Sequence, residues 1–383
     1  MKGTVQQMNY NALDRRSFLK TSLLGGAALA LPWSATRALA GGGGFRTDTP
    51  AQSAAALKAA LEANLVKTTS RVSLTTGEDR TDMAFQALKP FAKEITAAIG
   101  NKRVVIKPNF LVTNKQLAAT DARNVEGILE FLKSIGKADN VLITESPSQG
   151  KAQVGYVNYG YDKLAAKYPG VKLGELDDDE IETLWLYSEK DSHPHPCRVS
   201  KTLLDPNNFV ISPAKLKTHD RVIATLSLKN IVLGSAIKRA GSERAEGGYI
   251  GDSDKPTMHG GGIYGINFNL CQLALRGLHP HLAVIDGYEG MEGQGPGNGT
   301  PINSRVCVAS LDWLAADRVG VELMGIDFSK IGYLNYCAQA GMGQADLTKI
   351  EIAGPALKDY IKPYKMPNGM EKMLGWQKPV TTS

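Results

Sequence analysis

Short apolar segments alternate with helical patterns from about residue 100 onward, and this alternation constrains the fold more than any other feature. The apolar segments are only six to eight residues long, as expected for strands. They lie at 103–110, 140–146, 171–176, 208–213, 282–287, 305–310 and 349–354. Helical patterns occur at 122–136, 161–168, 265–278, 312–325 and 329–341. The alternation predicts an α/β fold of three layers, with a largely parallel sheet and helices on both faces.

The first forty residues are typical of an export signal. A twin-arginine pattern, DRRSFLK, precedes an apolar run that contains two glycines, and ALA at 38–40 fits a cleavage site for small residues. The run is too short to span a bilayer, and no later segment approaches the roughly 18 apolar residues that a membrane helix needs. We therefore expect residues 1–40 to be a twin-arginine signal peptide. The mature protein is then expected to be soluble and periplasmic or otherwise extracytoplasmic, with no permanent membrane span.

The charge of the chain argues against one class of function. The whole chain has 44 Lys and Arg against 38 Asp and Glu, a net charge of +6. Residues 1–40 hold five of the basic residues and one of the acidic residues, which leaves 39 against 37, or +2, after cleavage. A nucleic-acid-binding protein needs a concentrated basic face. The sequence therefore predicts no nucleic acid partner.

Composition divides the rest of the chain into a leader, a main domain and a tail. Residues 41–100 start with GGGGF and contain two alanine-rich helical segments, 51–66 and 81–99, the second broken at Pro90. We assign the α/β domain to 101–355 and a C-terminal tail to 356–383. Residues 177–207, acidic and then proline-rich, are interpreted as a surface excursion. Residues 235–263 are polar and glycine-rich without periodicity, and a loop of that length is usually functional or mobile.

Cysteine spacing bears on the cofactor. The four cysteines are far apart and form no C-x-x-C pair, so the sequence predicts neither an internal iron–sulfur cluster nor a zinc ribbon. The twin-arginine pathway exports folded proteins, often with a cofactor already bound. A divalent metal is the cofactor that we consider, and its identity stays open.

Unusual polar residues follow several predicted strands, at the sheet edge where α/β proteins bind ligands. The predicted anion-binding residues are Lys107, Asn109, Lys215, Lys217, Asn230, Gly295 and Gly297. Clustered ammonium groups repel one another unless an anion lies between them, so the lysines predict binding of an anionic small molecule. Crowding also lowers the pKa of a lysine, which would let one of them act as a base or form a Schiff base. The alternative is that each lysine pairs with a nearby carboxylate.

Histidines and carboxylates at the same strand ends suggest further chemistry. His219, His259 and Lys229 are candidates for acid/base catalysis. Asp286, Glu289 and Glu145 are candidate ligands for a divalent metal, although an aspartate such as Asp286 can also simply initiate a turn. The glycine-rich segment 290–299 can present amides to an anion, but its prolines exclude a dinucleotide-binding helix.

Several of these segments together resemble a known family. IKPNF, SPAKLKTH, SLKNIVLG, VIDGYEGMEGQGPGNG and DWLAADRVGVELMG are similar to the domain of unknown function family 362, from about residue 100 to 326. The resemblance implies no reaction. It implies that the family pattern includes Lys107, Asn109, Lys215, Lys217, His219, Lys229, Asn230, Asp286, Gly290, Gly295, Gly297 and Asp317. Some relatives carry a ferredoxin module, whose cysteine cluster this chain lacks.

Two classes of function fit the same lysines. The first is an exported enzyme that acts on an anionic small molecule, with metal-assisted acid/base chemistry. The second is a non-catalytic periplasmic protein that carries a cofactor or metal, or matures a redox partner. A deep pocket closed by residues 235–263, with a proton-transfer group inside, would favour the enzyme. An open site facing a partner would favour the carrier.

Overall fold

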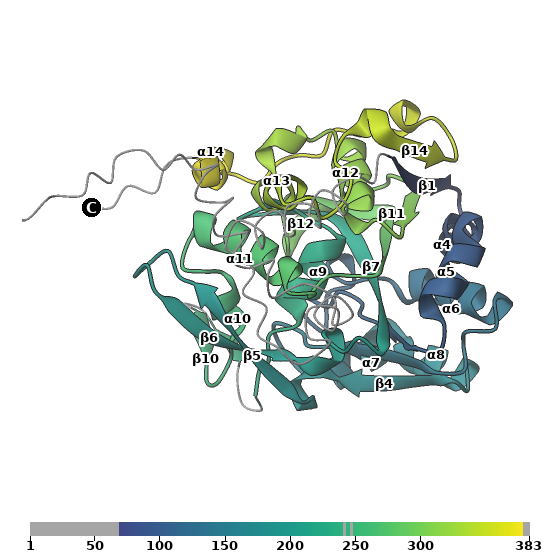
Figure 1. Ribbon diagram of the computed structural model, residues 1–383, viewed down its shortest axis with the longest axis horizontal. Coiled ribbons are helices and arrows are strands. Elements are labelled where there is room, and N and C mark those ends of the chain that lie inside the picture. Colours follow the sequence, from purple (N-terminus) through teal and green to yellow (C-terminus); the bar gives the residue numbers. More distant parts are fainter. Residues whose placement is uncertain (1–68, 240–242, 246–247, 378–383) are drawn as a thin grey trace, which may run out of the picture. The chain divides into compact units, whose positions relative to one another are not determined.

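A ten-stranded sheet organises the part of the chain described by the computed structural model, residues 69–239, 243–245 and 248–377 (Figure 1). The strand order is β14–β1–β13–β11–β7–β2–β3–β4, with β8 paired to β7 and β12 paired to β11. The strands are β1 (Ser70–Thr76), β2 (Arg103–Ile106), β3 (Val141–Glu145), β4 (Val171–Glu175), β7 (Asn208–His219), β8 (Ile223–Thr225), β11 (Leu282–Gln294), β12 (Asn298–Ile302), β13 (Val306–Ser310) and β14 (Ile350–Ala353).

The central strands confirm the predicted parallel sheet. Strands β11, β7, β2, β3 and β4 pair in parallel with their neighbours in that order. Strand β13 is antiparallel to both β11 and β1, and β1 is parallel to β14. The carboxyl ends of β2, β3 and β7 therefore meet at one edge of the sheet.

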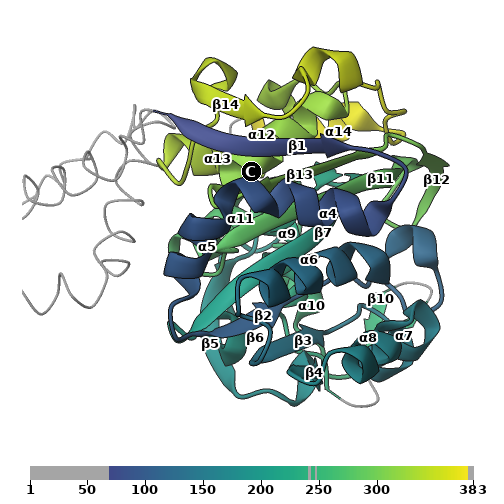
Figure 2. The ribbon, with the colours of Figure 1, turned by 90° about the vertical axis from the view of Figure 1, so that its right-hand side faces the viewer.

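Helices cover both faces of this sheet, which confirms the three-layer α/β fold. One face carries α4 (Arg80–Leu88), α5 (Ala92–Ile99), α6 (Ala122–Ser134), α7 (Ala152–Tyr159) and α8 (Tyr161–Lys167), of which Figure 2 shows α4, α5 and α6 in front of the strands. The other face carries α9 (Ser227–Gly234), α11 (Ile263–Leu275), α12 (Trp313–Leu323) and α13 (Gly332–Gln339).

Side chains of β7 alternate between the two faces of the sheet, so this strand packs against both helical layers. Phe209 and Ile211 belong to the buried cluster on the α6 side. Leu216 faces the opposite layer, where a methyl group added to Gly320 of α12 would contact it at 3.5 Å. Successive side chains of a strand point to opposite faces. Both faces of β7 are buried, and its first half contains the apolar run Phe209–Ile211.

Helix boundaries follow the predicted capping signals. The Asp121 side chain accepts a hydrogen bond from the Arg123 amide at the start of α6, and Asp312 accepts one from the Ala315 amide at the start of α12. The helical segment 81–99 is interrupted by a 3₁₀ turn, Lys89–Phe91, that contains Pro90. The predicted signal peptide, the glycine leader and the helix at 51–66 lie outside the described residues.

The main unit extends beyond the predicted limits of 101–355. Strand β1 lies inside the sheet, and the buried side chains of Tyr364 and Trp376 belong to the segment assigned to a tail. All the described residues belong to one compact unit. A short strand with polar residues such as β1, SRVSLTT, has too weak an apolar pattern to be recognised before its neighbours are known.

The two segments without clear periodicity contain regular structure. Residues 177–207 include a hairpin of β5 (Ile181–Tyr187) and β6 (Pro194–Ser200), visible at the lower left of Figure 1. Residues 235–263 include β9 (Glu243–Ala245), β10 (Gly248–Ile250) and the short helix α10 (Lys255–Met258). A further short helix, α14, spans Met370–Met373. The placement of α10 matters most, because it borders the site described next.

Candidate functional site

A pocket of about 370 Å³ lies beyond the carboxyl ends of β2 and β3, beside the end of β7. Helices α9 and α10 supply its other walls. Eight of the residues predicted from the sequence line it: Lys107, Asn109, Glu145, Lys217, His219, Lys229, Asn230 and His259. Residues separated by more than one hundred positions thus meet at one sheet edge, as expected for a parallel α/β fold.

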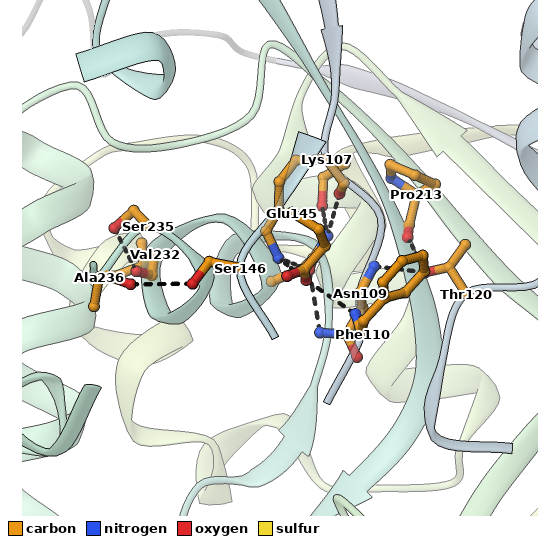
Figure 3. A network of polar contacts seen from close by, with 12 residues as sticks. Lys107, Asn109, Phe110, Thr120, Glu145, Ser146, Pro213, Val232, Ser235 and Ala236 are labelled. Atoms are coloured by element: carbon orange, nitrogen blue, oxygen red, sulfur yellow. Dashed lines mark hydrogen bonds and ion pairs between the residues drawn. The ribbon is translucent and has the colours of Figure 1, made fainter. Parts of the chain in front are cut away.

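Lys107 and Glu145 form a fully buried ion pair at the floor of this pocket (Figure 3). The Lys107 Nζ donates to Glu145 Oε1 at 2.5 Å and to Asn230 Oδ1 at 3.0 Å. Glu145 Oε1 also accepts from the Phe110 amide at 2.9 Å. Its Oε2 is buried without a hydrogen-bond partner among the described residues. Burial lowers the pKa of Lys107, and the Glu145 carboxylate opposes this effect.

Asn230 of α9 is hydrogen-bonded to the segment that follows β2 and to strand β7. Its Nδ2 donates to the Lys107 carbonyl at 2.8 Å and to Ser212 Oγ of β7 at 3.0 Å, while its Oδ1 also accepts from Asn109 Nδ2 at 3.2 Å. All the donor and acceptor capacity of the amide is directed at protein groups. Asn230 therefore positions Lys107 and Asn109 rather than offering a free group to a ligand.

Lys217 enters the pocket from β7 and is held by neutral acceptors. Its Nζ donates to Asn109 Oδ1 at 2.5 Å and to the Ala118 carbonyl at 3.0 Å. Burial lowers its pKa well below the ordinary value, and the charges of Lys229, Lys215 and Lys107 lower it further. The electrostatic environment of Lys217 is therefore strongly positive.

Lys229 lies in the first turn of α9 and is buried. No hydrogen bond or ion pair joins its Nζ to any other residue in the described parts of the chain. The pKa of Lys229 is lowered to about 7, mainly by burial; Asp220 opposes this effect, and Arg221 and Lys107 add to it. An amine with this pKa is neutral in a large fraction of molecules near neutral pH.

Helix α9 begins where it does because Asp317 of α12 holds its first residues. The Asp317 carboxylate accepts from the Ser227 amide at 2.8 Å, from Ser227 Oγ at 2.6 Å and from the Leu228 amide at 3.2 Å. Burial raises the pKa of Asp317 to about 7 despite these donors. Asp317 thus caps the helix that presents Lys229 and Asn230 to the pocket.

The two histidines line the same pocket from different elements. At the end of β7, His219 Nδ1 accepts from the Arg221 amide at 3.0 Å, and its pKa is well below the usual range, first because of burial and then because of Lys229. We therefore assign a neutral ring with the proton on Nε2. The 3.3 Å approach of Asp220 to Nδ1 is then no ion pair. His259 Nδ1 donates to the Lys255 carbonyl at 2.9 Å.

Lys255 is a pocket residue that the sequence did not reveal. Its Nζ donates to the carbonyls of Ser146 at 2.9 Å and Ala236 at 3.0 Å, and burial lowers its pKa to about 8. Arg221, Ser146 and Ser148 also line the pocket. Lys255 lies in the polar segment 235–263, where a lysine gives no sign of burial. The expectation that this segment is functional was the one signal that pointed to it.

The structure separates the remaining predicted residues from the pocket. Lys215 lies beside Asp286 in the register of β7 and β11, in a buried cluster where Arg80 Nε approaches Asp286 Oδ1 at 3.4 Å. Burial is the main cause that lowers the pKa of Lys215 and raises that of Asp286. Glu289 continues β11 beyond this cluster. Asp286 thus pairs with Arg80, whereas no hydrogen bond or ion pair joins it to Lys215 in the described residues.

The three carboxylates predicted to bind a metal do not meet. Glu145 ends β3 and Asp286 lies on β11, with β7 and β2 between these strands. Among residues 69–239, 243–245 and 248–377, no three His, Cys, Asp or Glu side chains are arranged to hold a metal ion. The sequence could not reveal this separation because it does not specify the order of strands.

Gly295 and Gly297 allow close packing of the turn that follows β11. A Cβ on Gly295 would overlap the Thr218 carbonyl, and one on Gly297 would lie 2.9 Å from Leu111 Cδ2. The Gly295 amide donates to the Gly293 carbonyl at 2.8 Å, so it is not directed at a ligand. Pro296, between the two glycines, is the residue of this turn that lines the pocket.

These features define an α/β protein with a buried, lysine-rich pocket at the carboxyl edge of its sheet. The family model of DUF362, a domain of unknown function, matches residues 104–322, and the chain belongs to this family. All residues that line the pocket fall within the matched segment.

The chain is also similar to the thylakoid-associated protein sll1697 of Synechocystis sp. The two are 26% identical over 230 residues, which cover 59% of this chain and 64% of that protein. The chain thus spans less than two thirds of the length of this relative. No solved structure matches the chain. In the described residues, no helix combines the length and apolar character needed to cross a membrane.

Proposed function

We propose that this protein binds an anionic small molecule in the pocket and promotes proton transfer on it, in an extracytoplasmic compartment. The observation that carries the proposal is the charge of the pocket lining. Its described residues include two carboxylates, Glu145 and Asp220, against five cationic side chains: Lys107, Lys217, Arg221, Lys229 and Lys255. Asp220 and Arg221 are exposed, which leaves four buried lysines against one buried carboxylate. A buried site with this imbalance is stable only if some lysines are neutral or an anion enters.

The individual contacts locate the uncompensated charge. Glu145 compensates Lys107, whereas Lys217 and Lys255 contact only neutral oxygens. An anion beside Lys217 and Lys229 would favour their charged forms and would bind more tightly for that reason. The pocket volume of about 370 Å³ suits a small molecule.

Two groups in the pocket suit proton transfer. Lys229, with a pKa of about 7, can accept or donate a proton near neutral pH. The Nε2–H of neutral His219 can donate a hydrogen bond to an oxygen of the ligand. The segment 235–263 borders the pocket through Lys255, Pro256, His259 and Gly261. This enclosure favours an enzyme over a carrier protein with an open site.

Thermal unfolding with a panel of phosphate, sulfate, oxalate, malonate and citrate tests the proposal. An anion that binds the folded protein raises its unfolding temperature in proportion to the logarithm of its concentration. We expect at least one panel member to stabilise the wild-type protein. Lys217→Met and Lys229→Met should weaken that anion at least about tenfold in calorimetry, a change of ~1.4 kcal/mol.

Lys172 provides a matched control because it is an exposed lysine on β4, remote from the pocket lining. Lys172→Met should bind the anion as the wild-type protein does. Equal affinity in all three variants, or no stabilisation by any anion in the panel, would contradict the proposal. Native mass spectrometry of protein purified from the periplasm would identify a retained ligand directly.

A further inference from the structure

The four buried lysines of the pocket differ in how their amines are held. Lys107 is bound by Glu145 and Asn230, Lys217 by Asn109 and the Ala118 carbonyl, and Lys255 by two backbone carbonyls. Lys229 has no such partner in the described residues, although only 6% of its surface is exposed. Three lysines are therefore fixed by the protein, and the fourth is left to interact with whatever enters.

A buried amine that makes no hydrogen bond is poorly suited to carry a positive charge for a structural purpose. A buried ammonium needs acceptors for its three protons, and their absence favours the neutral amine with a free lone pair. Burial lowers the pKa of Lys229 to about 7, in agreement with this geometry. A neutral, desolvated lysine amine is the form that attacks carbonyl carbons.

The groups around Lys229 complement a carbonyl compound that carries a negative charge. Lys217 and Lys229 line the same pocket, so the ammonium group of Lys217 can attract the carboxylate of a molecule that enters it. His219 also lines the pocket, and its Nε2–H can donate to a carbonyl oxygen because Nδ1 is occupied by the Arg221 amide. The pocket thus offers a nucleophile, a hydrogen-bond donor and an anion site within one enclosure.

We infer that Lys229 forms a Schiff base with an anionic carbonyl compound of the 2-oxo acid class. This inference rests on the proposed anion-binding function and specifies its substrate class. Lys217 holds the carboxylate, and His219 positions the carbonyl oxygen. Asp317 acts indirectly as a positioning residue, because it fixes the start of the helix that carries Lys229.

The step balances without an oxidant or reductant. The Lys229 lone pair attacks the carbonyl carbon, the carbon–oxygen π bond breaks, and one of the two amine protons is transferred to the oxygen to give a neutral carbinolamine. The carbon–oxygen bond then breaks, and the hydroxyl group leaves with the second amine proton as water, which yields the carbon–nitrogen double bond. His219 donates a hydrogen bond to this oxygen throughout, and the protons can exchange with water in the pocket.

Reductive trapping tests the inference. Purified protein would be incubated with glyoxylate, pyruvate or 2-oxoglutarate and reduced with sodium cyanoborohydride, and modified lysines would be mapped by peptide mass spectrometry. We expect one of these acids to modify Lys229 at least tenfold more than exposed Lys172. Hydroxyacetone, a neutral ketone of similar size, should give less than a tenth of that modification because it lacks the carboxylate.

Lys229→Arg separates imine formation from anion binding, since arginine retains the positive charge but forms no such imine. In this variant the adduct should be lost while oxalate, used as an unreactive probe, still raises the unfolding temperature. Modification confined to Lys217 or to surface lysines, or no adduct above that of the denatured chain, would overturn the inference. If no Lys229 adduct forms but oxalate still binds, the proposed anion-binding function remains intact. If neither the adduct nor oxalate binding is observed, both the Schiff base and the proposed function are refuted.

Discussion

Gly234 leaves room for the side chain of Lys107 at the last residue of α9. A Cβ added to Gly234 would overlap the Lys107 Nζ and Cε. The backbone of Gly234 does not have the positive φ that would require glycine for conformational reasons. The glycine is therefore needed for space, and it permits the ammonium to reach Glu145 and Asn230.

Gly234→Ala should consequently disturb the ion pair. Alanine favours the helix by up to ~1 kcal/mol, but crowding a packed site typically costs about 1–3 kcal/mol. We expect a net loss of about 1–2 kcal/mol in the free energy of unfolding, measured in urea, together with weaker anion binding. Gly375→Ala is the control because its Cβ would lie 3.8 Å from the nearest atom. Equal stability of the two variants would contradict the steric role of Gly234.

The Lys107–Glu145 pair should show strong coupling in a double-mutant cycle. Removing one partner of a buried ion pair costs about 3–5 kcal/mol because the other charge stays buried. Lys107→Met and Glu145→Gln should each destabilise the protein, and the double variant should lose less than the sum of the two. Urea unfolding of the four proteins provides the cycle. Additive effects would indicate that the pair contributes no coupling.

Lys229 should make stability depend on pH in a defined direction. Its pKa is about 7 in the folded protein and 10.5 in the reference state. Between these values the unfolded chain binds more protons, so stability of the wild-type protein falls as pH decreases from about 10.5 to about 7. Lys229→Met removes this loss, which amounts to at most ~1.4 kcal/mol per pH unit. Parallel pH profiles of both proteins would refute the low pKa.

Asp317 should make the stability of the folded protein fall as pH rises, which is opposite to the effect of Lys229. Its pKa is raised from 3.8 to about 7, so its contribution is full below about pH 4 and is lost as pH rises through 7. Asp317→Asn should flatten this part of the stability profile while keeping one acceptor for α9. Asp317→Ala should cost a further ~1–2 kcal/mol through loss of the helix cap. Unfolding curves at pH 5, 6, 7 and 8 would reveal both effects, and a profile unchanged by the asparagine would contradict the assignment.

The sequence predicted which polar residues follow the strands better than it predicted which of them lie together in the folded protein. Lys107, Glu145 and His219 follow apolar segments, and the parallel sheet brings them to one edge. Lys215 and Lys217 share a face by alternation, but a register shift in β11 between Asp286 and Met291 gives them different neighbours. Such a shift depends on pairing between distant strands, which local periodicity does not encode.

Lys255 shows the second limit of sequence reasoning. A lysine in a polar, glycine-rich segment is normally solvated. The burial of Lys255 depends on the carbonyls of Ser146 and Ala236, which follow β3 and α9. Asp317 was recognised by family resemblance and not by its local pattern, because a helix cap supplied from another helix leaves no signature in the capped sequence.

Strand β7 is buried along all twelve residues and is paired with β2, β8 and β11. Amides in such a strand exchange with deuterium mainly through global unfolding, whereas a four-residue helix such as α10 opens locally. The wall that carries Lys217 and His219 should thus exchange over days while residues 255–261 exchange within minutes. If ligands enter and leave past α10, a bound anion should slow exchange at 255–261 and leave β7 unchanged.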